Sequence, residues 1–255
     1  MRLRRIIEHL RDQNWTAVVL DFAIVVIGIV VGLEVNNWND ARRDAVRGDQ
    51  YLERIHVDLL ADVAAIKRRS IFWSDVTDYG RTALDFAENG KLRNGSAWDT
   101  LLAFYQASQI WTYSASNGTY QEMIGGGDLA LVSSPEMRSS LADYYVTGGR
   151  RLARLVDVIP AYREEIRGLT PMRVQRYIWA NCHRLLSNDR QELVDCESPI
   201  TETEARMILA GFVKSQEVTK GLRFWMTNLE VTSGLARLNQ VSAERLAAKV
   251  AKEIG

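Results

Sequence analysis

The sequence predicts an all-α protein in which an N-terminal transmembrane helix is followed by a long helix and a multi-helix bundle. Near the N-terminus an apolar run extends over 20 residues, and apolar residues then recur at spacings of three and four through most of the chain. Strand signals are thin by comparison. We expect three parts: a short tail over 1–14, a transmembrane helix over 15–38, and a helical soluble domain over 39–255.

The apolar run covers residues 16–35 and reads TAVVLDFAIVVIGIVVGLEV. At about 1.5 Å per residue it is long enough to cross a hydrocarbon layer of about 30 Å. Trp15 and Trp38 bracket it, where amphipathic rings favour the two interfaces. Its acids, Asp21 and Glu34, lie near its ends and so avoid the full mid-bilayer cost of a charge. Because no small-residue cleavage site follows, we expect an uncleaved anchor in a lipid bilayer.

One face of the predicted span carries small residues. Gly28 and Gly32 form a GxxxG pair, which lets two helices approach closely, and Asp21 shares their helical stripe. This pattern predicts helix packing and a homo-oligomer formed through the span. Two interpretations of Asp21 stay open: a functional intramembrane acid, or a side chain that reaches the headgroups.

The tail over 1–14 is basic and amphipathic, and we expect it in the cytoplasm. Arginines are nearly balanced around the span, with Arg2, Arg4, Arg5 and Arg11 before it and Arg42, Arg43 and Arg47 after it. The short tail favours an N-terminus inside, and a long following domain can cross the membrane whatever its charge. The sequence therefore predicts a single-pass protein whose C-terminal domain lies on the opposite side of the membrane from its N-terminus.

Two cysteines, Cys182 and Cys196, flank a polar stretch that reads as a loop. A bridge between them is a candidate disulfide, and disulfides persist outside the cytosol. Two separate reduced thiols are the alternative. A metal site is disfavoured because only His183 lies near the pair and the chain has no CxxC motif.

Apolar spacing predicts a long helix after the span, through Leu52, Ile55, Leu59, Val63 and Ile66 to an end at Gly90. Further helices are expected after N-terminal signals at Ser96, Thr119, Ser134, Thr170 and Thr201. The helix that begins at Pro135 should break or bend at Gly148, Gly149 and Pro160. A C-terminal helix follows, on the pattern of Leu222, Trp225, Leu229, Leu235 and Leu238.

Composition and motifs exclude several classes of function. The chain has 32 basic and 32 acidic residues and no basic patch, so we expect no nucleic-acid partner. HExxH, GxSxG, SxxK and phosphate-loop patterns are absent from the sequence. The glycines of GGGD at 125–128 are typical of a helix terminus. We therefore expect no enzyme activity and no cofactor.

The densest polar and aromatic stretch runs from Trp111 to Met123. Trp111, Tyr113, Asn117, Tyr120 and Glu122 form a candidate ligand or partner pocket, because pockets combine aromatic walls with a few polar groups. The alternative, which the turn at SNGT favours, is that the aromatics fill the core and that Thr119 and Glu122 make a capping box.

Three stretches of the chain share a recognisable pattern. The span ends near N-x-W-N-[DE], a Y-L-x-x-[IL]-x-x-D-L helix follows, and a T-[FY]-x-x-[LM]-x-x-x-G segment comes later. The residues that match are Asn37, Trp38, Asn39, Tyr51, Leu52, Asp58, Leu59, Thr119, Tyr120, Gly127, Arg138 and Tyr144. In these stretches the chain resembles a bacterial family of single-span proteins classed as a domain of unknown function. The resemblance implies an N-inside anchor in the bacterial inner membrane with an exported, periplasmic helical domain, and it implies no activity.

Together these observations lead to the hypothesis of a membrane-anchored interaction or scaffold protein of the bacterial envelope. Its expected partners are the bilayer, a second copy of itself, and an envelope or membrane protein. The alternative is a ligand-binding sensor or an accessory subunit of a membrane complex.

Overall fold

The computed structural model describes residues 15–187 and 189–255, with side chains from residue 18 onward. The predicted tail over 1–14 and the side chain of Trp15 lie outside these residues. The chain divides into two compact units at Gln50 and Tyr51, and the second unit extends to Gly255. We call this second part the helical unit. It begins later than the domain start that the sequence predicts at residue 39.

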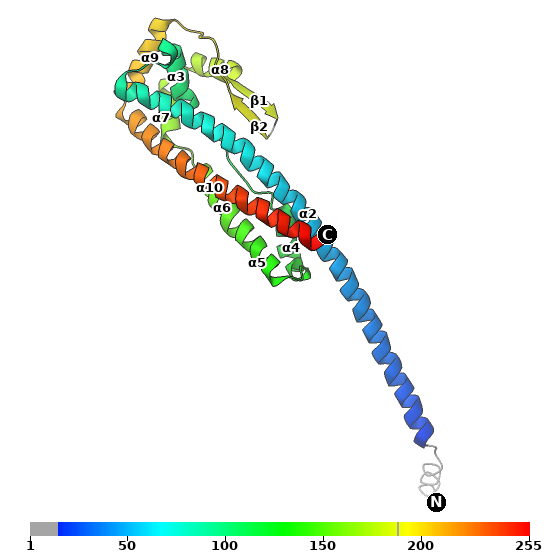
Figure 1. Cartoon of the computed structure of the whole chain (residues 1–255). Coiled ribbons are helices and arrows are strands. Elements are labelled where there is room, and N and C mark those ends of the chain that lie inside the picture. Colours follow the sequence, from blue (N-terminus) through cyan, green and yellow to red (C-terminus); the bar gives the residue numbers. More distant parts are fainter. Residues whose placement is uncertain (1–14, 188) are drawn as a thin grey trace, which may run out of the picture. The chain divides into compact units, whose positions relative to one another are not determined.

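Helices make up most of the structure, as predicted (Figure 1). Their bounds, with the short 3₁₀ and π segments labelled η, are α2 (Trp15–Asn89), η1 (Arg93–Gly95), α3 (Ala97–Gln106), α4 (Gly118–Gly126), η2 (Asp128–Leu131), α5 (Pro135–Ala142), η3 (Asp143–Gly148), α6 (Gly149–Val156), α7 (Ala161–Leu169), α8 (Met172–Asn181), α9 (Glu202–Lys214) and α10 (Gln216–Ile254). The two strands are β1 (His183–Ser187) and β2 (Arg190–Leu193).

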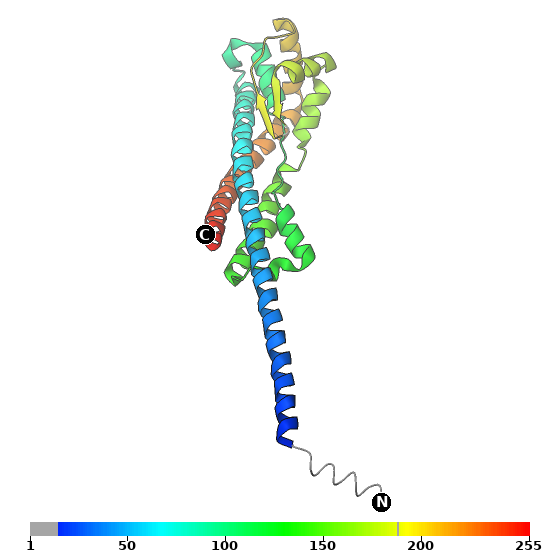
Figure 2. The same cartoon turned by 90° about the vertical axis from the view of Figure 1, so that its right-hand side faces the viewer.

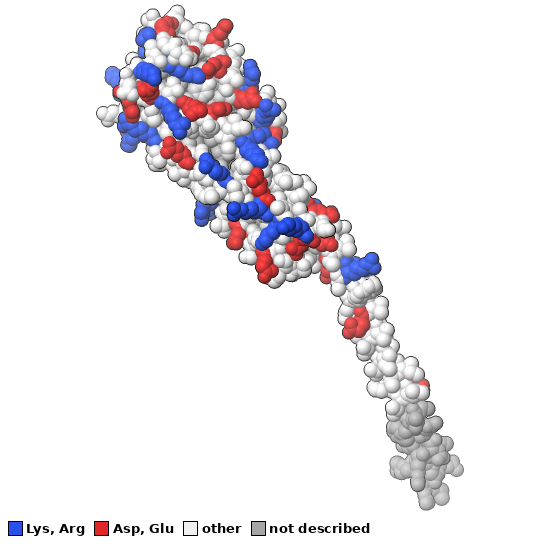
Figure 3. All heavy atoms as spheres, in the orientation of Figure 1, with Lys and Arg blue, Asp and Glu red and all other residues white. Residues whose placement is uncertain are grey.

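The first unit contains the apolar start of α2. From Val18 this helix is long and apolar enough to cross a membrane, and its best 18-residue window has a mean hydropathy of 2.6 with none of its surface buried. On the face visible in Figure 3, uncharged atoms cover most of this segment, whereas charged side chains of both signs cover the helical unit. A lipid-facing helix has this composition.

Within the helical unit, α2 and α10 run side by side in opposite directions (Figures 1 and 2). Ion pairs join their exposed edges, with 3.2 Å between Lys67 and Glu244 and 2.8 Å between Arg223 and Glu88. The end of α2 follows the sequence prediction, because Gly90 adopts a left-handed φ of 70° and its N–H donates to the carbonyl of Phe86.

Two apolar clusters hold the helical unit together. The larger one packs α3, α7, α8 and α9 against residues 66–83 of α2 and against the first half of α10. At its centre are Trp73, Phe104, Tyr162, Phe212 and Trp225. The smaller one packs α4, α5 and η3 against residues 51–63 in the middle of α2 and against the end of α10. Figure 1 shows these two groups of short helices at opposite ends of the long pair. This arrangement is the predicted bundle.

Three of the predicted helix starts are confirmed by side-chain caps. Ser96 accepts from the N–H of Asp99, Ser134 from that of Met137, and Thr201 from that of Glu204, at distances of 3.1, 3.1 and 3.2 Å. The predicted break after α5 is also confirmed, because Gly148 and Gly149 mark the change from the π-helical η3 to α6, and Pro160 precedes α7.

Two predicted caps are wrong. Thr119 lies inside α4, whose N-cap is Asn117, and Glu122 pairs with Arg54 of α2 and makes no capping box. The hydroxyl of Thr170 donates back to the carbonyl of Ile166 and closes the end of α7. Glu122 instead contacts a distant helix, and Thr170 instead bonds to the preceding turn of its own helix. Neither side chain is then available for the helix cap that the sequence predicts.

The stretch between the two cysteines is an antiparallel β-hairpin and not the predicted loop. His183 pairs with Leu193, and Leu185 pairs with Gln191. Its strands alternate too weakly to be read from a sequence, because all of β1 after His183 is exposed. On α10, Leu238 also departs from the prediction, since 65% of its surface is exposed and it faces away from the core.

Glycines on α10 give a matched pair of stability predictions. At Gly221 a Cβ would lie 3.3 Å from the Tyr162 Cβ and 3.4 Å from its Cα, so α7 leaves no room for a methyl group. Gly234 has open space on the same helix. We expect Gly234→Ala to stabilise by about 0.5–1 kcal/mol through helix propensity and Gly221→Ala to destabilise by about 1 kcal/mol. Urea unfolding of the two variants checks this, and equal effects would contradict the close α7–α10 approach.

Candidate functional site

A buried polar layer lies in the helical unit where the two apolar clusters meet. Asp58 and Asp62 stand one turn apart on the inward side of α2, among Leu59 and Val63 of one cluster and Ile66 of the other. Asp62 has no exposed surface. Its carboxylate accepts hydrogen bonds from the Ser116 N–H and the Tyr144 hydroxyl, both at 2.7 Å. A buried carboxylate is tolerable only with such partners.

The π-helical segment η3 supplies the tyrosines of this layer. Tyr144 and Tyr145 both point inward, and Tyr145 stacks on Tyr120 with ring centroids 4.8 Å apart. The segment approaches α10 closely because Gly148 has no side chain. A Cβ there would lie 2.8 Å from the Asn239 Oδ1. Short π segments often occur at functional sites, where they redirect side chains.

Burial shifts the pKa of Asp62 and of the tyrosines around it. It raises the pKa of Asp62, although the hydrogen bonds from Ser116 and Tyr144 oppose this shift. Burial also raises the pKa of Tyr144 and Tyr113, and the nearby Asp62 carboxylate adds to both shifts. The tyrosines therefore stay neutral and act as hydrogen-bond donors.

Two buried polar atoms of the layer, Asp58 Oδ2 and the Tyr145 hydroxyl, make no hydrogen bond to any described residue. The Tyr113 hydroxyl interacts with Tyr144 and with the Asn239 amide. Such atoms are rare in folded proteins and point to strain or to a binding role. Chemically the layer offers donors and acceptors for recognition. Among residues 15–187 and 189–255, no three His, Cys, Asp or Glu side chains gather as metal ligands.

The five residues of the predicted pocket do not share one cavity. Trp111 and Tyr113 lie in or against the larger apolar cluster, where both rings face the guanidinium of Arg69. Tyr120 is buried in the smaller cluster. Asn117 and Glu122 are exposed. The alternative interpretation, core packing beneath a turn, therefore describes the aromatic residues better, and only Tyr113 belongs to the polar layer.

Glu122 instead belongs to a surface cluster that joins α4 to α2. Arg54 donates two hydrogen bonds to its carboxylate, and this pairing lowers the pKa of Glu122. Next to it, the Tyr51 hydroxyl donates to Asp128 at 2.8 Å. These contacts fix the start of the helical unit to the loop at GGGD. There α4 ends on Gly127 in the left-handed conformation, as the sequence predicts.

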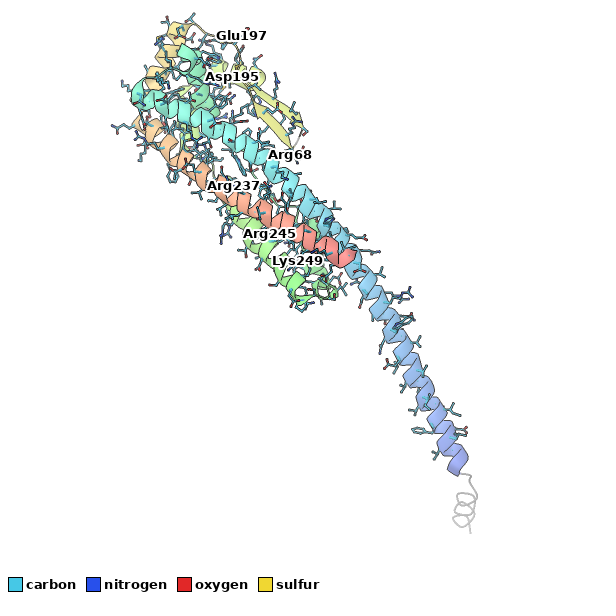
Figure 4. All side chains as sticks on the ribbon, viewed as in Figure 1. Arg68, Asp195, Glu197, Arg237, Arg245 and Lys249 are labelled. Atoms are coloured by element: carbon cyan, nitrogen blue, oxygen red, sulfur yellow. A yellow bond between two sulfur atoms is a disulfide. The ribbon has the colours of Figure 1, made fainter. Side chains whose placement is uncertain are left out.

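Cys182 and Cys196 form a disulfide in the structure, with their Cα atoms 5.2 Å apart. The bridge closes the β-hairpin at its base. Side chains of α3 hold both cysteine carbonyls, since the Gln106 amide donates to Cys182 and the Trp98 indole to Cys196. At the hairpin tip, Arg68 of α2 pairs with Asp189 (Figure 4).

In the first unit, Asp21, Gly28 and Gly32 lie on exposed helix surface. Added Cβ atoms at the two glycines would meet nothing within 4 Å. Their face is therefore free for contact with lipid or with another helix.

Sequence reasoning missed Asp58, Asp62 and Asn239. A signal for the first two existed, because both fall within the 3 and 4 spacing of the apolar face that runs from Leu52 to Ile66. No signal marked Asn239, since its burial depends on the approach of η3 from another part of the chain.

Comparison with known proteins adds no relative, because no family model, curated protein or solved structure matches the chain.

Proposed function

We propose that this chain is a single-span protein of the bacterial envelope whose helical unit is an interaction module for an acidic amphipathic helix of a partner protein. We propose further that its N-terminus lies in the cytoplasm and the helical unit in the periplasm. The apolar start of α2 supports the anchor. The disulfide between Cys182 and Cys196 supports the export, because cytosolic thiols stay reduced.

The observation that carries the docking proposal is a groove of about 610 Å³ beside α6 and α10. Apolar side chains line it, among them Val146, Leu155, Val231 and Leu235. Val146 and Val231 are 45% and 51% exposed. Exposed apolar residues that gather in a concave strip are typical of protein docking sites.

Three arginines of α6, Arg150, Arg151 and Arg154, also line this groove. All three are exposed, and none forms an ion pair or a hydrogen bond with a residue in the described part of the chain. Elsewhere on the helical unit, arginines such as Arg54 and Arg93 are paired with acids. Unpaired guanidinium groups along an apolar groove favour a ligand that brings carboxylates.

The neighbouring surface of α10 extends the apolar strip. Phe224, Val231 and Leu238 follow one another at intervals of seven residues and are 68%, 51% and 65% exposed. A partner helix with apolar residues at the same period would cover this strip. Its acidic residues would then face α6. A flat lipid surface matches a concave groove less well than a helix does.

Photo-crosslinking in intact cells tests this proposal. A photoreactive amino acid replaces Val231 in the groove or, as the matched control, Met207, which is 65% exposed on α9. We expect a discrete heteromeric adduct only from position 231, and mass spectrometry should place it in an acidic amphipathic helix. Changing Arg150, Arg151 and Arg154 together to Gln should remove the adduct.

Three outcomes would contradict the docking proposal. The first is adducts with lipid alone, the second is adducts with a second copy alone, and the third is an adduct that persists in the triple Gln variant.

Self-association through the span is a separate part of the proposed function. Replacing Gly28 and Gly32 with Ile should reduce the signal of a membrane self-association reporter several-fold, because bulk on this face keeps two helices apart. Ala23→Ile is the matched control, since Ala23 lies on the opposite face at about 100° per residue. An unchanged signal in the glycine variant would remove the dimer from the proposal.

A further inference from the structure

A second cavity lies on the helical unit between η3 and the last turns of α10. Its volume is about 390 Å³, which is within the size range of small-molecule sites. Ser140 and Asp143 line it on one side, and Ser242, Arg245, Leu246 and Lys249 line it from α10. Figure 4 shows Arg245 and Lys249 on these last turns, beside α5.

The two sides of this cavity carry opposite charges that do not pair with each other. Arg245 forms no ion pair or hydrogen bond with any residue of 15–187 or 189–255, and the same is true of Asp143 across the cavity. Lys249 donates one hydrogen bond to the Ser140 hydroxyl, at 3.1 Å, and has no acid partner in the described chain. The cavity thus presents two cations and one carboxylate, each able to take a ligand group.

The back of the cavity borders the buried polar layer. Tyr144 and Gly148 line it there, and Asn239 lies directly behind Gly148. Asn239 is only 5% exposed, and its amide interacts with the Tyr113 hydroxyl inside the layer. Polar groups therefore lie behind this wall of the cavity.

We propose that this cavity binds a small zwitterion, an α-amino acid or a dipeptide. The ligand carboxylate lies between Arg245 and Lys249, and the ligand ammonium group pairs with Asp143. The buried Leu246 offers contact for a small apolar side chain. A dianion such as inorganic phosphate fits less well, because it would use the two cations but would face the Asp143 carboxylate.

Isothermal titration of the full-length protein in nanodiscs tests this assignment with defined probes. They are alanine, alanyl-alanine, propionate, ethylamine and inorganic phosphate. Propionate and ethylamine are alanine without its amino group and without its carboxylate. We expect alanine or alanyl-alanine to bind at least tenfold more tightly than either fragment and than phosphate, because only a zwitterion uses both sides of the cavity.

Three variants connect the binding to named residues. Arg245→Gln should weaken zwitterion binding at least tenfold, whereas Arg237→Gln, at an exposed site on the same helix, should leave it unchanged (Figure 4). Asp143→Asn should weaken the zwitterion and leave propionate unaffected. All three sites are exposed, and thermal unfolding confirms that each variant is folded.

Two results would overturn the proposal. One is propionate or phosphate that binds as tightly as the zwitterions, and the other is no binding of any probe. Loss of the crosslink at the α6 groove would not affect this test, because the two sites have separate lining residues.

Discussion

Replacing Asp62 with alanine is expected to destabilise the helical unit by about 2–4 kcal/mol. The variant leaves the Ser116 N–H and the Tyr144 hydroxyl buried without their shared acceptor. Each lost hydrogen bond to a charged group costs about 1.5–3 kcal/mol, and relief of the desolvated carboxylate offsets part of that sum. Urea unfolding of the full-length protein in detergent, followed by circular dichroism, measures the change.

Asp58 provides the matched control for this prediction. It lies one turn earlier on α2, and its Oδ2 is buried without a hydrogen-bond partner in the described chain. Asp58→Ala removes an acceptor that has no partner and leaves no hydrogen-bond donor unpaired. We therefore expect the free energy of unfolding to change by no more than about 0.5–1 kcal/mol. If both alanine variants lose equal stability, the hydrogen bonds of Asp62 are not what matters, and the loss reflects side-chain volume or net charge.

Asp62 also predicts the sign of a pH dependence. Burial raises its pKa in the folded protein above the ordinary aspartate value of 3.8. Between the unfolded and folded values, the native protein keeps a proton that the unfolded chain has released. Stability contributed by this group is therefore present at low pH and is lost as the pH rises through the folded pKa. In Asp62→Ala this contribution disappears. A stability difference between wild type and variant that does not change from pH 4 to pH 7 would contradict the raised pKa.

The sequence predicted the class of fold because helices here follow local rules. Apolar spacing and Gly90 identified the end of α2, although the span and the long helix predicted after it form one continuous helix. Serine and threonine caps marked the starts of α3, α5 and α9. The same local rules failed where a distant residue competed. Glu122 pairs with Arg54 and does not form the predicted capping box. The short hairpin at 183–193 has weak strand propensity and is held at its base by the cysteine bridge and at its tip by Arg68.

The candidate sites were less predictable for a physical reason. The polar layer brings together Asp62, Ser116, Tyr144 and Asn239, which come from four separate parts of the chain. Periodicity shows which residues of one helix face inward, and it does not show which residues of another helix they meet. The side chains of the polar and aromatic stretch 111–123 do not form one site. Some lie in or against the larger apolar cluster, some lie in the smaller one, and others are on the surface. A carboxylate inside an apolar stripe is the better signal, and it was present at Asp58 and Asp62.

Removal of the disulfide is the second change with a large expected effect. The bridge joins residues separated by 14 positions, and closing a loop of this length stabilises by about 3 kcal/mol. Cys182→Ala with Cys196→Ala should therefore lower the Tm by about 6–12 °C for a domain of this size. Reductant should lower the Tm of the wild type by a similar amount and leave the double variant unchanged. A wild type that is fully reduced, by thiol titration, yet melts at the same temperature would contradict the stabilising role.

The same two cysteines also test on which side of the membrane the helical unit lies. Intact cells are treated with a membrane-impermeant thiol reagent, with and without prior reduction, and the double variant controls for other labelling. Because the sequence has no other cysteine, all specific labelling reports on this pair. Labelling only after reduction would support a formed bridge on the outer side of the membrane, as proposed for an envelope docking module. Labelling only after lysis would reverse the proposed topology and would direct the search for the acidic partner helix to the cytosol.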